Sequence, residues 1–112
     1  MARILRGEVR WANLSAGHGH EPGGERPVLV LSQDVFNDRS GTAIVMAITS
    51  QVQQVGFPLA LELHSGGLPR RSWVKTSQVR TLSTTRLGRR LGVVSPEEVA
   101  QALQGLGEIL GS

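Results

Sequence analysis

Two short and nearly continuous apolar runs do most to limit what this chain can fold into. They read RPVLVLSQ over residues 26–33 and TAIVMAIT over residues 42–49. Apolar runs of this length, without alternation, are typical of strands that are buried on both faces of a sheet. A chain of 112 residues has room for one modest core. We therefore expect these two strands to lie at the centre of that core.

Four further segments have the pattern of strands. Residues 8–14 and 58–63 alternate between apolar and polar side chains, residues 72–82 are rich in β-branched residues, and residues 89–94 form a short last strand. Residues 35–41 read as a polar connection with room for a helical turn. The spacing of these strands suits a small, strongly bent antiparallel sheet or half-open barrel.

The hydrophobic period changes at residue 95. Ser95 is a predicted N-cap, Pro96 suits the first helical position, and Glu98 stands three residues after the cap. Apolar residues then recur at helical spacing, at Val99, Ala102, Leu103, Leu106 and Leu110. The chain is therefore predicted to be mainly β, of the α+β class, with a C-terminal helix.

Composition excludes several classes of protein. There is no cysteine, so no disulfide framework or thiolate metal site is expected. No apolar run approaches the length of roughly 20 residues that spans a membrane, and the start lacks the apolar core of a signal peptide. We expect residues 1–112 to form a single cytoplasmic domain.

The positive charge is concentrated in the body of the chain. Residues 1–90 hold all twelve basic residues and six acidic ones, whereas residues 91–112 carry three acidic residues and no basic one. Eleven of the twelve are arginines, whose planar guanidinium suits phosphate groups. A polyanionic partner and a general preference for arginine over lysine explain this composition equally well.

The three histidines give only weak evidence for a metal site. His18 and His20 form an H-x-H pair, and a third ligand would have to be His64 or a carboxylate such as Glu21. The chain also lacks a G-x-S-x-G motif, a cysteine nucleophile and a phosphate-binding glycine motif. We therefore predict no metal and no cofactor.

Polar side chains gather where the predicted strands begin or end. They are Glu21, Glu25 and Arg26, then Thr49, Ser50 and Gln51, and then Gln78, Arg80 and Thr81. Hydroxyls, amides and arginines in such positions are suited to binding phosphate groups. From the residues alone, the alternative is that residues 49–51 satisfy the backbone of a turn and that Arg80 pairs with an acid.

Four motifs in order carry a resemblance to a known family. They are R-G-E-V-x-W at 6–11, G-x-E-x-G-G-x-R-P-V-L-V-L-S at 19–32, A-I-T-S-Q at 47–51, and Q-V-R-T-L-S-x-x-R-L at 78–87. From about residue 6 to residue 110 the chain resembles the MazF/PemK toxins of bacterial type II toxin–antitoxin systems. The resemblance implies a small SH3-like barrel of about five to seven antiparallel strands, shared in outline with the CcdB gyrase poisons.

The resemblance also implies a function. It implies a homodimeric, metal-independent and sequence-specific endoribonuclease, an mRNA interferase, that acts on single-stranded RNA. The neighbouring 2′-hydroxyl would attack and leave 2′,3′-cyclic phosphate and 5′-hydroxyl ends, and a cognate antitoxin would neutralise the toxin through an acidic C-terminal segment. The alternative is a non-catalytic toxin of the same fold, such as a gyrase poison, although a pure binder would not need both Arg26 and Thr49.

The family's site residues fall on named positions of this chain. The resemblance implies that Arg26 and Thr49 are catalytic, that Glu21 lies at the site, and that Gln78 lies beside RNA. We expect RNA contacts from Ser50, Gln51, Gln78, Arg80 and Thr81. This chain reads His20-Glu21-Pro22 where relatives often read Ser-Glu-Gln. His20 is therefore a candidate acid or base oriented by Glu21, or alternatively a loop residue that only contacts RNA or none.

Overall fold

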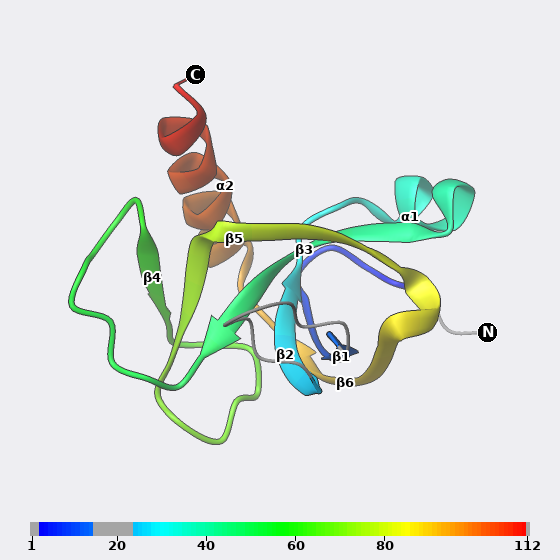
Figure 1. The fold of residues 1–112 in the computed structure, drawn as a ribbon, viewed down its shortest axis with the longest axis horizontal. Helices are drawn as coiled ribbons and strands as arrows, with labels where there is room; N and C mark the ends of the chain where they lie inside the picture. Colours follow the sequence, from blue (N-terminus) through cyan, green and yellow to red (C-terminus); the bar gives the residue numbers. More distant parts are fainter. Residues whose placement is uncertain (1–2, 15–23, 112) are drawn as a thin grey trace.

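A computed structural model describes residues 3–14 and 24–111 of the chain. Its elements, in chain order, are β1 (Glu8–Asn13), β2 (Glu25–Val30), α1 (Asp34–Ser40), β3 (Thr42–Thr49), β4 (Ala60–Leu63), β5 (Ser72–Ser83), the 3₁₀-helix η1 (Thr84–Arg86), β6 (Leu87–Val93) and α2 (Pro96–Leu110) (Figure 1). The predicted strands and the C-terminal helix are confirmed. The predicted polar connection after the first apolar run is instead a complete seven-residue helix, α1.

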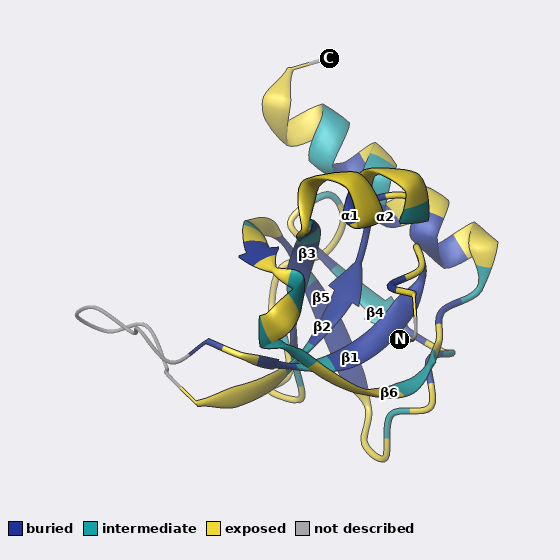
Figure 2. Ribbon diagram, turned by 90° about the vertical axis from the view of Figure 1, so that its right-hand side faces the viewer, coloured by how far each residue is buried: buried dark blue, intermediate teal, exposed yellow. Residues whose placement is uncertain are grey.

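All six strands form one antiparallel sheet in the order β4-β5-β3-β2-β1-β6. The two apolar runs are β2 and β3, and they lie in the middle of this order. Leu29 and Met46 belong to one buried cluster, and Val28 and Val45 belong to a second cluster on the opposite face. Burial on both faces explains why these runs do not alternate, and Figure 2 shows the central strands as the buried part of the fold.

The edges of the sheet approach each other through a glycine contact. The turn between β4 and β5 passes so close to β6 that a Cβ atom on Gly92 would lie 2.3 Å from the carbonyl oxygen of Gly66. A Cβ atom on Gly67 would lie 2.5 Å from the carbonyl oxygen of Leu91. Only residues without a side chain permit this approach, which bends the sheet toward a barrel.

The predicted start of α2 is confirmed, and it also holds the turn after β4. The Ser95 hydroxyl accepts a hydrogen bond from the Glu98 backbone N–H at 3.2 Å. The Glu98 carboxylate accepts no hydrogen bond from the Ser95 backbone N–H in return. It accepts hydrogen bonds from the His64 backbone N–H at 2.8 Å and from the Ser65 hydroxyl, and the Ser65 oxygen in turn accepts one from the Ser95 N–H at 2.9 Å.

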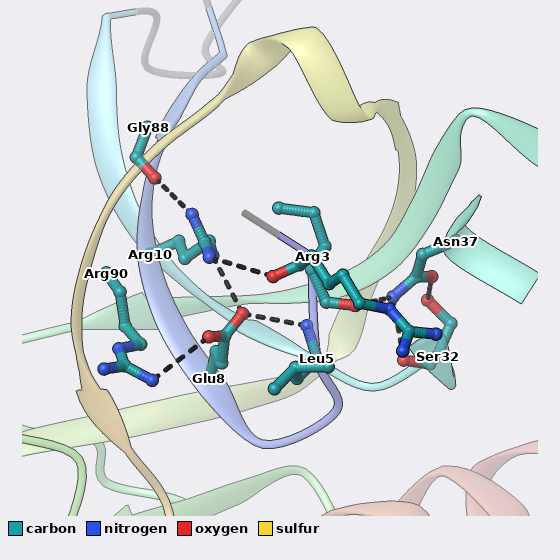
Figure 3. Close-up of polar contacts among 9 residues, drawn as sticks. Arg3, Leu5, Glu8, Arg10, Ser32, Asn37, Gly88 and Arg90 are labelled. Atoms are coloured by element: carbon teal, nitrogen blue, oxygen red, sulfur yellow. Dashed lines mark hydrogen bonds and ion pairs between the residues drawn. The ribbon is translucent and has the colours of Figure 1, made fainter. Parts of the chain in front are cut away.

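The motif at residues 6–11 has a structural role. Glu8 is 2% exposed and Arg10 is 8% exposed, and Arg10 Nε lies 2.9 Å from Glu8 Oε1 (Figure 3). The same oxygen of Glu8 accepts a hydrogen bond from the Leu5 backbone N–H, and Arg10 Nη1 donates to the Gly88 carbonyl. These contacts join β1 to β6 and to the segment before β1.

Among the described residues, no helix is both long and apolar enough to cross a membrane.

Candidate active site

Arg26 and Thr49 lie at the same end of the ladder between β2 and β3. Its recorded pairs are Val28 with Ala47, Leu29 with Met46 and Val30 with Val45. Arg26 lies two residues beyond the last pair on β2, and Thr49 lies two residues beyond it on β3. Because strand side chains alternate between faces, Arg26 lies on the face of Val28 and Thr49 on the face of Ala47, which is one face of the sheet.

The guanidinium of Arg26 is available to a ligand. Arg26 is exposed and pairs with Ala12 in the ladder between β1 and β2. It forms no ion pair with a residue in the described part of the chain. The buried residues that follow on β2 hold the backbone of Arg26 in place, so its exposed cation starts from a fixed point at this end of the sheet.

Thr49 ends β3 and begins a turn that is hydrogen-bonded within itself. Thr49 Oγ1 accepts a hydrogen bond from the Gln51 backbone N–H at 3.1 Å, and the Gln53 side chain donates to the Gln51 carbonyl at 3.0 Å. The residue-based interpretation, that this segment satisfies turn backbone, is therefore correct for the Thr49 oxygen. This contact leaves the Thr49 O–H to act as a donor. Ser50 and Gln51 are exposed beside it.

The three candidates on β5 are not brought together. Arg80 pairs with Val45, so it lies on the face of Arg26 and Thr49, and it forms no ion pair with any described acid. Thr81 pairs with Ile44 and lies on the opposite face. Gln78 is exposed and lies where the pairing of β5 with β3 shifts register. RNA contacts by Gln78 and Thr81 stay predictions.

A further polar group beside Thr49 is absent from the sequence-based predictions. Trp73 on β5 pairs with Thr49 on one side and with Glu62 of β4 on the other. The guanidinium of Arg71 lies over the Trp73 ring, 4.8 Å from its centroid, and it forms an ion pair with Glu62. The hydrogen bond from Arg71 holds the pKa of the Glu62 carboxyl below its ordinary value. Only the strand register places these residues beside Thr49, so no local sequence signal could have found them.

The remaining catalytic candidates, His20 and Glu21, lie outside the described residues, as does His18. Within residues 3–14 and 24–111, no group of three histidine or carboxylate side chains is close enough together to hold a metal ion. The described residues bring three hydrogen-bond donors for an anion to one face of the sheet. They are the Arg26 guanidinium, the Thr49 hydroxyl and the Arg80 guanidinium.

Comparison with known proteins gives consistent matches over nearly the whole chain. Residues 5–110 match the family described as PemK-like, MazF-like toxin of type II toxin–antitoxin system. The chain is 40% identical over 106 residues to Endoribonuclease EndoA of Bacillus subtilis. The matched region covers 90% of this chain and 91% of that protein. It superposes on MazF from Deinococcus radiodurans with a TM-score of 0.85, 28% identity and full coverage of both chains. A MazE–MazF structure from the same organism matches with a TM-score of 0.79 and 25% identity, covering 99% of this chain and 98% of that chain.

Proposed function

Because the chain belongs to the family of PemK-like, MazF-like toxins and is an endoribonuclease toxin of that family, we propose that it cuts single-stranded RNA at short sequence motifs without a metal ion. The observation that carries this proposal is the placement of Arg26 and Thr49 at one end of one sheet face. An exposed guanidinium and a hydroxyl donor there suit a phosphodiester. The body of the chain, with its excess of arginine, suits the rest of a polyanion.

The chemistry needs no group beyond the RNA and the protein. The 2′-hydroxyl attacks the adjacent phosphorus, a pentacoordinate phosphorane develops negative charge, and the bond to the 5′-oxygen breaks. The products are a 2′,3′-cyclic phosphate and a 5′-hydroxyl. Arg26 and the Thr49 O–H would donate hydrogen bonds to the phosphorane oxygens, because that charge is larger in the transition state than in the substrate. Guanidinium groups stay protonated at neutral pH, so Arg26 acts as an electrostatic clamp rather than as a base.

Proton transfer then falls to other groups. A base must remove the proton of the 2′-hydroxyl, and an acid must protonate the leaving 5′-oxygen. We propose that His20 takes one of these roles with Glu21 orienting its ring, because histidine titrates near neutral pH and stands where relatives often carry serine. The basis for this assignment is the sequence alone.

The antitoxin would compete with RNA for the same face. The matching Deinococcus structure contains MazE together with MazF. We propose that a cognate antitoxin lays an acidic C-terminal segment across the arginines at Arg26 and Arg80, where a carboxylate can replace a phosphate. We also propose that the protein is a homodimer and that it acts in the cytoplasm, where messenger RNA is available.

The test is cleavage of a long single-stranded RNA in EDTA, followed by mapping of both new ends. We expect discrete cuts with cyclic phosphate and 5′-hydroxyl ends. Arg26→Ala and Thr49→Ala should keep the fold and lower the rate by about 100-fold or more, the usual effect of removing a donor to developing charge. Arg39→Ala is the matched control, because it removes the same charge from an exposed position on α1.

Two outcomes would contradict the proposal. Uncut RNA in EDTA with the wild-type protein would remove the metal-free mechanism. Near-normal cutting by both Arg26→Ala and Thr49→Ala would remove these residues from the site. For His20, the same assay run across pH compares wild type with His20→Ser, and superimposable profiles would exclude proton transfer by this side chain.

A further inference from the structure

The side chain of Arg71 is held in one orientation although it is largely exposed. Its Nε lies 2.5 Å from Glu62 Oε2 and its Nη2 lies 3.0 Å from Glu62 Oε1, so the ion pair is bidentate. One face of the guanidinium covers the Trp73 ring at 4.8 Å from the centroid. The side chain is nevertheless 65% exposed, so its other face is turned to solvent.

This group lies next to the proposed site. Trp73, which is 6% exposed beneath Arg71, pairs directly with Thr49 across the ladder between β3 and β5. Directly opposed residues of antiparallel strands have Cβ atoms roughly 5 Å apart. Glu62 pairs with Trp73 from the next strand, β4. A strand of RNA whose phosphate contacts Thr49 would therefore place an adjacent nucleotide within reach of Arg71.

The arrangement is suited to binding a nucleobase. Single-stranded RNA is recognised by stacking its bases on aromatic rings and on arginine guanidinium planes. A guanidinium already fixed on both an aromatic ring and a carboxylate loses little further freedom when a base stacks on its open face.

We propose that Arg71 is a base-stacking residue of this toxin: its open guanidinium face binds the nucleobase next to the scissile phosphate, and Glu62 and Trp73 are positioning residues that hold the plane. The site would take any base with a flat face and would contribute to the choice of cut sequence through the strength of stacking. This inference rests on the proposed function.

The test is binding of a single-stranded RNA oligomer that contains the mapped cut site. A 2′-deoxy nucleotide at the cut position removes the attacking hydroxyl, so that binding is measured without cleavage, by fluorescence anisotropy. Two further oligomers each carry one abasic nucleotide, on one or the other side of the cut. We compare wild type with Arg71→Lys, which keeps the charge and loses the plane, and with Arg70→Ala, which removes the charge of an exposed neighbour.

We expect Arg71→Lys to raise the Kd for the intact oligomer by at least about fivefold, the lower end of a base-stacking contribution. One of the two abasic oligomers should show the same loss with wild type and no further loss with Arg71→Lys. Arg70→Ala should weaken the intact and abasic oligomers by equal factors. The proposal is wrong if Arg71→Lys binds the intact oligomer like wild type, or if its loss is the same on all three oligomers.

Glu62→Ala gives a second test whose sign separates positioning from charge. Removing a carboxylate near RNA should strengthen binding if only charge matters, and weaken it if the carboxylate is needed to hold Arg71. We expect weaker binding of the intact oligomer, and stronger binding of the abasic oligomer that Arg71 distinguishes, because only the lost charge of Glu62 acts on that oligomer. Stronger binding of the intact oligomer would overturn the role given to Glu62. If wild-type protein leaves RNA uncut in EDTA, the proposed function fails. If it cuts RNA normally but the Arg71 and Glu62 variants bind every oligomer with the wild-type Kd, only the stacking role fails.

Discussion

At the scale of single residues, chemistry depends on what each side chain contacts. Arg10 and Arg26 occupy neighbouring strands, and both are arginines with an identical guanidinium. Arg10 is buried and satisfied by Glu8 and the Gly88 carbonyl, whereas Arg26 is exposed without a described acidic partner. The first therefore holds the fold together, and the second is available to a phosphate. Glu8, the partner of Arg10, belongs to the motif at residues 6–11, and its role here is structural rather than catalytic.

The Glu62 carboxyl provides a pH prediction at this scale. The hydrogen bond from Arg71, followed by the charge of Arg71 and that of His64, holds its pKa below the ordinary value of 4.5. The folded state therefore favours the ionised form. Its contribution to stability is complete above pH 4.5 and is lost as the pH falls through the lower folded pKa. An NMR titration of the Glu62 side chain should show a midpoint below 4.5.

The control variants for this titration are the two neighbouring arginines. Arg71→Ala should raise the Glu62 midpoint toward the ordinary value of a solvated glutamate, because it removes the hydrogen bond and the charge of Arg71. Arg70→Ala should leave the midpoint where it is in the wild type. An unchanged midpoint in Arg71→Ala would show that the ion pair does not form in solution.

At the scale of elements, local sequence pattern explains some helices and strands and fails for one helix. Local pattern accounts for β2 and β3, and for the cap of α2. It does not account for α1, because the buried residue of that helix is polar: Asn37 donates to the Ile4 carbonyl at 2.8 Å and contacts the Ser32 hydroxyl. A helix whose inner face is polar shows no hydrophobic period, so the sequence indicated only a polar connection with room for a helical turn there.

Two glycines of β6 give a matched prediction at this scale. A Cβ atom at Gly92 would lie 2.3 Å from the Gly66 carbonyl oxygen, whereas one at Gly88 would lie 3.6 Å from its nearest neighbours on Trp11. Gly92→Ala should lower the free energy of unfolding by about 2 kcal/mol or more, because backbone must move. Gly88→Ala should change it by less than about 1 kcal/mol. Urea unfolding measures both, and equal effects would contradict the glycine contact.

At the scale of the whole molecule, assembly is the property that one chain does not display. The described residues include large apolar side chains that remain exposed, at Val52, Phe57, Leu59 and Leu110, with exposed fractions of 68%, 46%, 46% and 73%. Such side chains are candidates for burial in a dimer. We predict a sedimenting species of twice the 12.0 kDa chain mass at the concentrations used for cleavage. A monomer that cuts RNA at those concentrations would contradict the prediction.

The sequence by itself determined the strands and the C-terminal helix, and through the family's motifs it indicated Arg26 and Thr49. These are local properties: the period of apolar residues, the cap at Ser95 and short ordered motifs can be read without knowing what packs against them. His20 and Glu21 likewise come from the sequence alone.

The tertiary structure decided which side chains share a face. Register places Arg80 on the face of Arg26 and Thr49, and it places Trp73 and Glu62 beside Thr49, although they lie far from it in the sequence. The physical reason is that pairing between distant strands is fixed by burial of both faces of β2 and β3 and by the close approach of β6 to the β4–β5 turn. Each depends on contacts between residues far apart in the chain, and no local pattern contains that information.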